Sequence, residues 1–176
     1  MSVATVLIAD DDPVMLAGLC LQARYHGLQP IAVGEGEVLT AARRHRPTVI
    51  VLDIHQRGFD GRDVLAQLKA DPATCGSEVV VISGHEDHAT QAECLALGAA
   101  AFRRKPVEWE FMESVAHLAY ELAHAREEAA WTDLASANDV EELIALEEDE
   151  DGLPWASSEA GEPPWLPGEV EVSLED

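Results

Sequence analysis

The sequence predicts an α/β domain in which helices cover both faces of a parallel sheet. Short apolar, β-branched runs alternate with amphipathic helical patterns along most of the chain. Strands that alternate with helices in this way pair in parallel, through right-handed crossovers. The runs are also continuously apolar, as in "TVIVLDI" at 48–54. Such runs are typical of strands that are buried on both faces of a sheet.

Five strand–helix pairs follow one another along the chain. Asp12 and Pro13 supply an N-cap and a proline at the start of the first helix. Gly27 and Gly98 are glycines of the kind that end helices. The predicted strands are 4–9, 28–33, 48–54, 78–83 and 100–104, and the predicted helices are 14–26, 36–45, 61–70, 86–99 and 107 to about 130.

Polar side chains follow four of these strands. Asp10 and Asp11 come after the first strand, and Asp53, Ser83 and Lys105 come at or just after the ends of the third, fourth and fifth. Each has an ordinary structural alternative, as a helix cap or a surface charge. Ligands of parallel α/β sheets bind where the carboxyl ends of the strands open. The convergence of five polar groups on that edge therefore favours a binding site.

Several short motifs around these residues resemble a known family. They are "IADDD" (8–12), "VIVLDI" (49–54), "FDG" (59–61), "VVVISG" (79–84) and "GAAAFRRKP" (98–106). Ser83 lies 30 residues after Asp53, and Lys105 lies 52 after it. Together these features resemble the response-regulator receiver domains of two-component signalling, over about residues 3–125. The resemblance implies a flavodoxin-like (βα)5 doubly wound parallel sheet of strand order 2-1-3-4-5.

The resemblance also implies a magnesium site. Three carboxylates within ~4–6 Å of one another repel by a few kcal/mol per pair. A divalent cation reverses that interaction, and Mg²⁺ prefers oxygen ligands. By resemblance, Asp11 and Asp53 bind Mg²⁺ directly, Asp10 binds it mainly through water, and the backbone carbonyl of His55 supplies a further oxygen. Asp12 is best interpreted as a helix cap.

Asp53 would accept a phosphoryl group from a phosphohistidine on a sensor histidine kinase or a histidine phosphotransfer protein. Ser83 and Lys105 would stabilise the phosphoryl oxygens. Gly84 is small and would leave the site open. On this reading the chain is a signalling switch, and it catalyses only its own phosphoryl transfer and dephosphorylation.

Two further residues match the family in the fifth strand and just after it. Phe102 occupies the position of an aromatic switch residue that turns inward on activation, although a simple core role is an equal alternative. Pro106 occupies the position of a cis-proline. The resemblance implies that output passes through the face formed by the fourth helix, fifth strand and fifth helix, toward a downstream protein target.

The loop after the third strand departs from the family pattern. Arg57, in "HQRGFDG" (55–61), stands where the family usually has proline. His55 lies two residues past Asp53, where side chains influence hydrolysis of the aspartyl phosphate. We therefore expect an altered phosphate lifetime, in a direction that the sequence does not set.

The charge is distributed unevenly. The net charge is -23, and residues 129–176 hold 15 acidic residues and no Lys or Arg. We expect a receiver domain at 1–128 and an acidic extension at 129–176, with a short helix at about 139–147 and disorder beyond it. Trp155 and Trp165 each follow a proline. They suit anchors by which the tail docks onto a partner or back onto the receiver, and the alternative is a solubilising tail in which the tryptophans are incidental. The alternative function is a phosphorylation-independent adaptor that acts through this tail.

Composition excludes several classes of function. An acidic surface repels nucleic acid, so we expect no direct DNA binding. No spanning segment or leader is visible, and the odd cysteine count implies no disulfide framework, so we expect a cytoplasmic protein without membrane insertion. No output domain follows the receiver pattern, which favours a stand-alone regulator, and the long last helix suits a homodimer stem or a linker. An aspartyl phosphatase would need a second aspartate at the position of His55.

Overall fold

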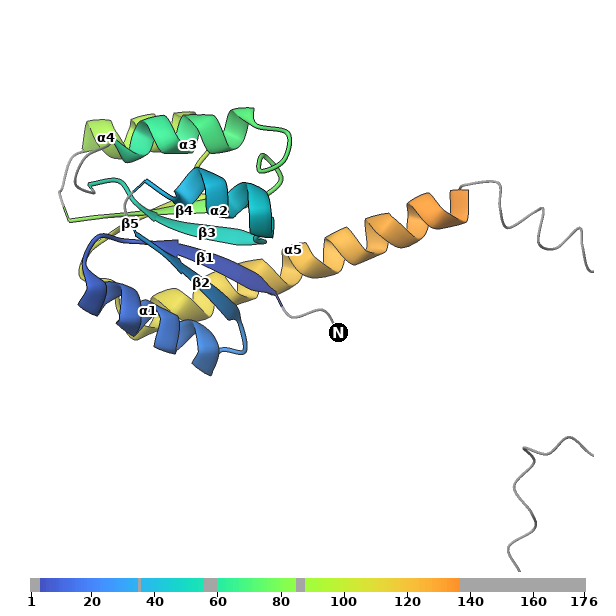
Figure 1. The fold of residues 1–176 in the computed structure, drawn as a ribbon, viewed down its shortest axis with the longest axis horizontal. Coiled ribbons are helices and arrows are strands. Elements are labelled where there is room, and N and C mark those ends of the chain that lie inside the picture. Colours follow the sequence, from blue (N-terminus) through green and yellow to red (C-terminus); the bar gives the residue numbers. More distant parts are fainter. Residues whose placement is uncertain (1–3, 35, 56–59, 85–87, 137–176) are drawn as a thin grey trace, which may run out of the picture. The chain divides into compact units, whose positions relative to one another are not determined.

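A computed structural model of the chain describes residues 4–34, 36–55, 60–84 and 88–136, with side chains as far as 132. Five parallel strands form one sheet in the order β2-β1-β3-β4-β5 (Figure 1), which confirms the predicted flavodoxin-like fold. The elements are β1 (Thr5–Ala9), α1 (Pro13–Tyr25), β2 (Gln29–Val33), α2 (Val38–His45), β3 (Val49–Asp53), α3 (Gly61–Ala70), β4 (Glu78–Ser83), α4 (His88–Ala96), β5 (Ala101–Arg104) and α5 (Trp109–Ser136).

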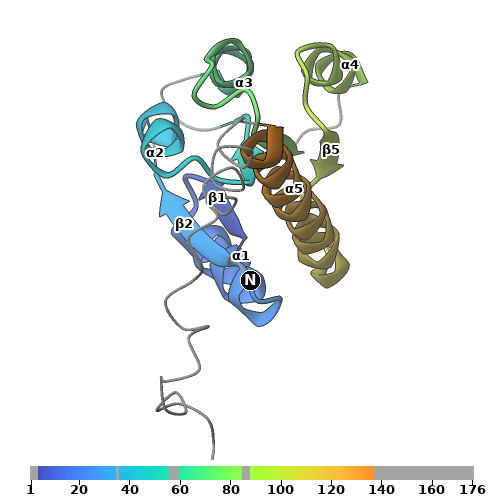
Figure 2. The same ribbon diagram turned by 90° about the vertical axis from the view of Figure 1, so that its right-hand side faces the viewer.

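Helices cover both faces of the sheet. Figures 1 and 2 show α1 and α5 on one face and α2, α3 and α4 on the other. Successive residues of β1 divide between two cores, because side chains alternate across a strand. Val6 and Ile8 pack with α1 and α5, whereas Leu7 and Ala9 pack with α2, α3 and α4. The central strands are therefore buried on both sides, as their continuous apolar sequences predicted.

The last helix, α5, is long, as predicted. It spans 28 residues, and Met112, Val115 and Ala119 on its inner side are buried in the core. Residues 124–132 are exposed. The chain divides into two units, Met1–Trp131 and Thr132–Asp176. Residues 129–136 of the predicted acidic extension belong to α5. The predicted short helix at about 139–147 and the predicted disorder beyond it fall outside the described residues, as do Arg57 and the two tryptophans that follow prolines.

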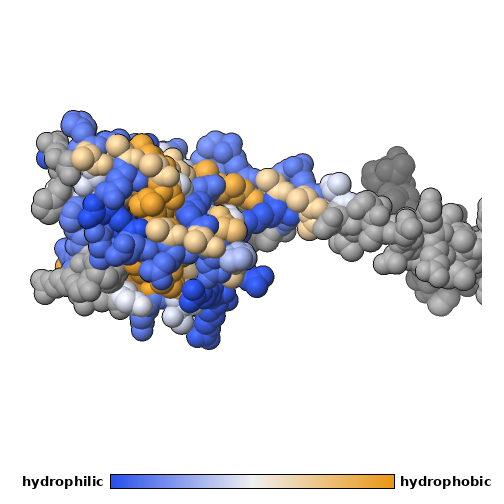
Figure 3. Space-filling view, turned by 90° about the horizontal axis from the view of Figure 1, so that it is seen from above, coloured by the Kyte–Doolittle hydropathy of each residue, from blue (hydrophilic) through white to orange (hydrophobic). Residues whose placement is uncertain are grey.

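The outward side of α1 is apolar. Val14, Leu21 and Tyr25 are 79%, 67% and 73% exposed, and helical spacing places them on one face together with Gly18. Arg24 is the only charged residue in this helix. We call Val14, Gly18, Leu21 and Tyr25 the α1 outer face. On the opposite side of the sheet, over α2, α3 and α4, hydrophilic and hydrophobic residues are interspersed (Figure 3).

A close backbone contact fixes the turn from β3 into α3. The Asp60 side chain caps α3 by accepting a hydrogen bond from the Arg62 backbone N–H at 3.0 Å. The backbone N–H of Gly61 donates to the Ile54 carbonyl at 3.1 Å. A Cβ atom at Gly61 would lie 2.4 Å from the Ile54 Cα, closer than real Cβ atoms approach. Glycine is therefore needed at position 61, the first residue of α3.

None of the helices in the described part of the chain combines the length and apolarity that a membrane span requires.

Candidate functional site

The three consecutive aspartates after β1 have different tasks. Asp12 caps α1, because its carboxylate accepts hydrogen bonds from the backbone N–H groups of Val14 and Met15 at 2.8 and 3.3 Å. Asp10 is 1% exposed, and its Oδ1 accepts from the Asp12 backbone N–H at 2.9 Å. The turn thus directs Asp12 to the helix and holds Asp10 inside. This separation confirms that Asp12 is a cap.

Asp53 ends β3 beside the pair from β1. It is 4% exposed, and its Oδ1 accepts a hydrogen bond from the His55 backbone N–H at 2.9 Å. Parallel pairing of β1 with β3 brings these two strand ends together. Carboxylate oxygens of Asp10, Asp11 and Asp53 lie within 4.8 Å of one another. At that separation two carboxylates repel by roughly 3 kcal/mol at an effective dielectric near 20.

Lys105 lies between two of these carboxylates. Its ammonium nitrogen Nζ donates to Asp10 Oδ2 at 2.6 Å and to Asp53 Oδ2 at 2.7 Å. Burial by itself lowers the pKa of Lys105, but hydrogen bonds to Asp10 and Asp53 and their negative charges outweigh it, so the pKa is raised. Lys105 is therefore held as a cation. Its backbone N–H donates to the Ser83 carbonyl at 2.7 Å, which ties the ends of β4 and β5 together.

Ser83 ends β4 and is fully buried at 0% exposure. Its Oγ lies 3.0 Å from Nδ1 of the exposed His55 ring, at hydrogen-bonding distance. Gly84 is exposed, and a Cβ there would meet no described atom within 4 Å. The sequence pointed to the backbone carbonyl of His55 and to a general influence of its side chain, whereas the contact of its ring with Ser83 emerges only from the structure.

Two predicted residues flank the cluster on β5 and just after it. Phe102 is half-buried and packs against the core formed with α2, α3 and α4. The peptide bond between Lys105 and Pro106 is cis. Arg103 and Arg104 are exposed between these positions.

The residues present fit a hard divalent cation. Three carboxylates and one ammonium carry a formal charge of minus two. All the nearby ligand atoms that Asp10, Asp11 and Asp53 offer are oxygens, which suit Mg²⁺. A cation with two charges would balance the cluster, and it would relieve the repulsion between the carboxylates.

The sequence patterns did not predict an ion-pair network that joins α3 to α4. The Arg62 guanidinium donates to Glu93 at 2.7 Å and to the Asp60 carboxylate at 3.0 Å. Hydrogen bonds from the Arg62 side chain hold the pKa of Asp60 below its usual value. The partners are 31 residues apart along the chain, so only the tertiary fold brings Arg62 to Glu93.

A sheet of order 2-1-3-4-5, with an acidic cluster at its carboxyl edge and a lysine just after its last strand, defines a flavodoxin-like α/β protein with a charged site at that edge. A family model described as the response regulator receiver domain matches residues 6–116. The chain belongs to that family, and it is a response regulator receiver domain of the kind found in two-component systems.

Relatives in sequence agree with this assignment. The chain is 32% identical to the probable transcriptional regulatory protein TcrX of Mycobacterium tuberculosis over 107 residues, which cover 60% of this chain and 45% of TcrX. It is 31% identical to the DNA-binding response regulator MtrA of Mycolicibacterium smegmatis over 77% of this chain and 57% of MtrA. It therefore spans about half the length of these two relatives. Protein PilH of Pseudomonas aeruginosa is 29% identical over 61% of this chain and 89% of PilH.

Solved structures share the fold. A CheY-like receiver domain protein of Methanospirillum hungatei superposes with a TM-score of 0.64 at 20% identity, over 70% of this chain and 99% of that one. The receiver domain of a putative LuxO repressor protein of Vibrio parahaemolyticus has a TM-score of 0.65 at 20% identity, over 77% and 99% of the two chains.

Proposed function

We propose that this protein accepts a phosphoryl group on Asp53, from a phosphohistidine on a sensor histidine kinase or a histidine phosphotransfer protein. The observation that carries the proposal is the cluster of Asp10, Asp11 and Asp53 with Lys105 between two of its members. A solved response regulator of Burkholderia pseudomallei with the same fold, 22% identical at a TM-score of 0.59 over 73% of this chain, contains a phosphorylated aspartic acid and a calcium ion.

The chemistry assigns a role to each side chain. A carboxylate oxygen of Asp53 attacks the phosphorus, a P–O bond forms, and the P–N bond to the donor imidazole breaks. Mg²⁺ would be held by Asp10, Asp11, Asp53 and the His55 carbonyl, and it would supply positive charge to the phosphoryl oxygens. Lys105 already contacts Asp53 and would donate to a phosphoryl oxygen in place of one carboxylate. Transfer of this kind needs mainly positioning and charge stabilisation.

Ser83 and Gly84, at the end of β4, would contribute to binding the proposed phosphoryl group. The Ser83 hydroxyl would donate to one phosphoryl oxygen. Gly84 would leave space for the donor to approach. Because the Lys105 backbone N–H bonds to the Ser83 carbonyl, a shift of one strand end would be passed to the other. The α4–β5–α5 face, with Phe102 as its switch aromatic, would then change population between two states.

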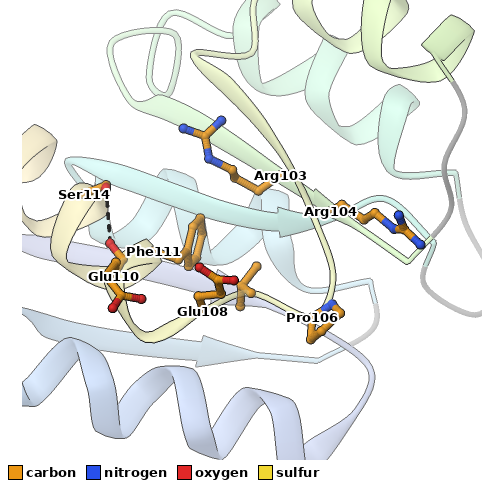
Figure 4. A pocket seen from close by; sticks show the side chains of 8 residues that line it. Arg103, Arg104, Pro106, Glu108, Glu110, Phe111 and Ser114 are labelled. Carbon is orange, nitrogen blue, oxygen red and sulfur yellow. Dashed lines mark hydrogen bonds between the residues drawn. The ribbon is translucent and has the colours of Figure 1, made fainter.

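This output face offers a mixed-charge surface to a downstream protein. A cavity of about 340 Å³ lies between β5 and the start of α5. Figure 4 shows Arg103 and Arg104 on the β5 side of it and Glu108, Glu110 and Phe111 on the other. Residues of both charges beside an aromatic ring suit a protein partner, whereas a phosphate backbone would be repelled by the acidic chain.

The α1 outer face suits the protein that delivers the phosphoryl group. The first turn of α1 follows Asp12, so the face begins beside the acidic cluster. Its exposed Val14, Leu21 and Tyr25 would be covered by the apolar side of a partner helix. The reaction would take place in the cytoplasm, which suits three cysteines that are all free thiols.

The proposal is tested with a small phosphoryl donor. The full chain is incubated with phosphoramidate and Mg²⁺, and intact mass and peptide mapping locate the modification. We expect one phosphoryl group on Asp53, none in Asp53→Asn, and none after chelation of Mg²⁺. Modification of another residue, or none at all, would refute the proposed reaction. If Asp53→Asn kept full partner binding and signalling in cells, the phosphorylation-independent adaptor would be supported instead.

A further inference from the structure

A groove lies where the end of α1 meets the first half of α5. It has a volume of about 540 Å³. The two helices are tied together at this place, because the Tyr120 hydroxyl donates to the His26 carbonyl at 3.2 Å. We call it the α1–α5 groove, and its walls are formed by His26, Glu113, Ser114, Ala116, His117 and Tyr120.

Three aromatic rings meet beside this groove. The Trp109 ring lies 5.2 Å from that of Tyr25 and 5.9 Å from that of His26, measured between ring centroids. Tyr25 and Trp109 are nevertheless exposed, as is Tyr120. Exposed aromatic rings that gather in one place are typical of surfaces that bind a partner. The groove therefore combines aromatic faces with polar walls.

The charge around the groove indicates the kind of partner. The α5 helix carries six acidic residues and one basic residue, Arg126. Glu113, in the wall of the groove, is exposed, and within the described part of the chain it makes no ion pair. His117, in the same wall, lies 3.2 Å from the carboxylate of Glu121, which balances any charge on its ring. A guanidinium stacks on exposed aromatic rings and donates hydrogen bonds to carboxylates, so these residues match an arginine side chain.

We propose that the α1–α5 groove is a docking site for an arginine on a basic segment of a partner protein. The inference goes beyond the proposed phosphoryl transfer, which uses none of the residues in the walls of the groove. Two other occupants lack the necessary charge. Residues 129–176 contain no Lys or Arg, so this segment supplies no such cation. A second copy of the chain would bring a net charge of -23 to a helix that is itself acidic.

Three short alanine peptides test the chemistry of recognition. They differ only in the central residue, which is arginine, lysine or citrulline, the uncharged analogue of arginine. NMR of the full chain follows the backbone amide signals of the groove residues during titration. We expect saturable shifts with the arginine peptide and binding of the lysine peptide that is about threefold weaker. We expect no saturation with the citrulline peptide, and equal binding of that peptide would overturn the proposal.

Matched variants locate the binding site. Trp109→Leu removes the ring and keeps an apolar side chain. We expect it to weaken binding of the arginine peptide about threefold, the factor that a cation–π contact contributes at an exposed site. Glu113→Gln removes the charge at nearly the same size, and we expect a similar loss. Trp131→Leu and Glu128→Gln make the same changes farther along α5 and should bind the peptide as wild type does.

Undiminished binding in Trp109→Leu and Glu113→Gln, or an equal loss in the two control variants, would overturn the proposal, since either would place binding elsewhere on the acidic chain. Sedimentation that shows self-association of wild type but not of Trp109→Leu would make a second copy the occupant, and would also overturn it. Circular dichroism checks that each variant is folded, which we expect because the substituted side chains are exposed. Phosphoramidate labelling of Asp53 should be equal in wild type and Trp109→Leu. Its absence in both would refute the proposed function and leave the docking site intact.

Discussion

The glycine at the start of α3 allows a sharp test of how the β3–α3 turn is held. Gly61→Ala would place a Cβ atom 2.4 Å from the Ile54 Cα and 2.9 Å from its Cβ. Ordinary contact begins near 3.4 Å, so the two segments must separate by about 1 Å. Ile54 is buried at 4% exposure, and its backbone cannot rotate away as a flexible side chain could.

Overpacking of this kind costs about 1–3 kcal/mol, more than alanine gains from lower backbone entropy in the unfolded chain. We expect Gly61→Ala to unfold about 5–10 °C below wild type. Urea titration followed by circular dichroism should show a lower midpoint at an unchanged slope. Gly34→Ala is the matched control, because no described atom lies within 4 Å of its added Cβ and its φ angle is not positive. Equal midpoints for the two variants would show that the turn yields freely, and would refute the reasoning.

Three more outcomes are expected. Lys105→Met leaves Asp10 and Asp53 without the ammonium between them, so the free energy of unfolding should fall by about 3 kcal/mol. Added Mg²⁺ should recover more stability in this variant than in wild type, and calorimetry with and without Mg²⁺ measures both effects. Asp60→Ala loses the α3 cap, worth about 1 kcal/mol at pH 7. The pKa of Asp60 is lower in the folded chain than its unfolded value of about 3.9. The carboxylate therefore stabilises wild type above that unfolded value, and the difference between the two urea midpoints should vanish as the pH falls through the folded pKa. Leu21→Glu should slow transfer from a phosphorylated histidine kinase while phosphoramidate labelling stays unchanged; equal slowing in the exposed α4 control Leu95→Glu would argue against docking on α1.

Local sequence signals predicted much of the fold. The strand at 78–83 and the helix at 61–70 match β4 and α3 at both ends. A β-branched run marks the strand in the sequence, and the structure shows that Asp60 caps the helix. The helix predicted from 36 begins at Val38, where Glu37 makes no side-chain cap hydrogen bond. A weak cap leaves the helix start to be set by packing. The fourth helix, predicted over 86–99, is described as His88–Ala96, and residues 85–87 lie outside the described part.

The residues of the candidate site that lie at strand ends could be predicted from the sequence. Asp10, Asp53 and Lys105 meet because parallel strands end at one edge of the sheet, and that edge follows from the alternation of strands and helices. The contact between His55 and Ser83 depends on the rotamer of an exposed ring after a strand end, and no periodic pattern encodes it. The roles of Gly84, Phe102 and Pro106 in signalling stay predictions.

The near absence of charge on the α1 outer face has a consequence for how pathways stay separate. Arg24 is the only charged residue of α1, although the whole chain carries a net charge of -23. If a kinase docks there, as proposed, it would meet a single charge on this helix, so shape would contribute more than charge to selection: the gap at Gly18 and the bulk of Leu21 and Tyr25. Discrimination between kinases should then change little with the ionic strength of the cell. It should change when a single methyl group is added to or removed from the α1 outer face.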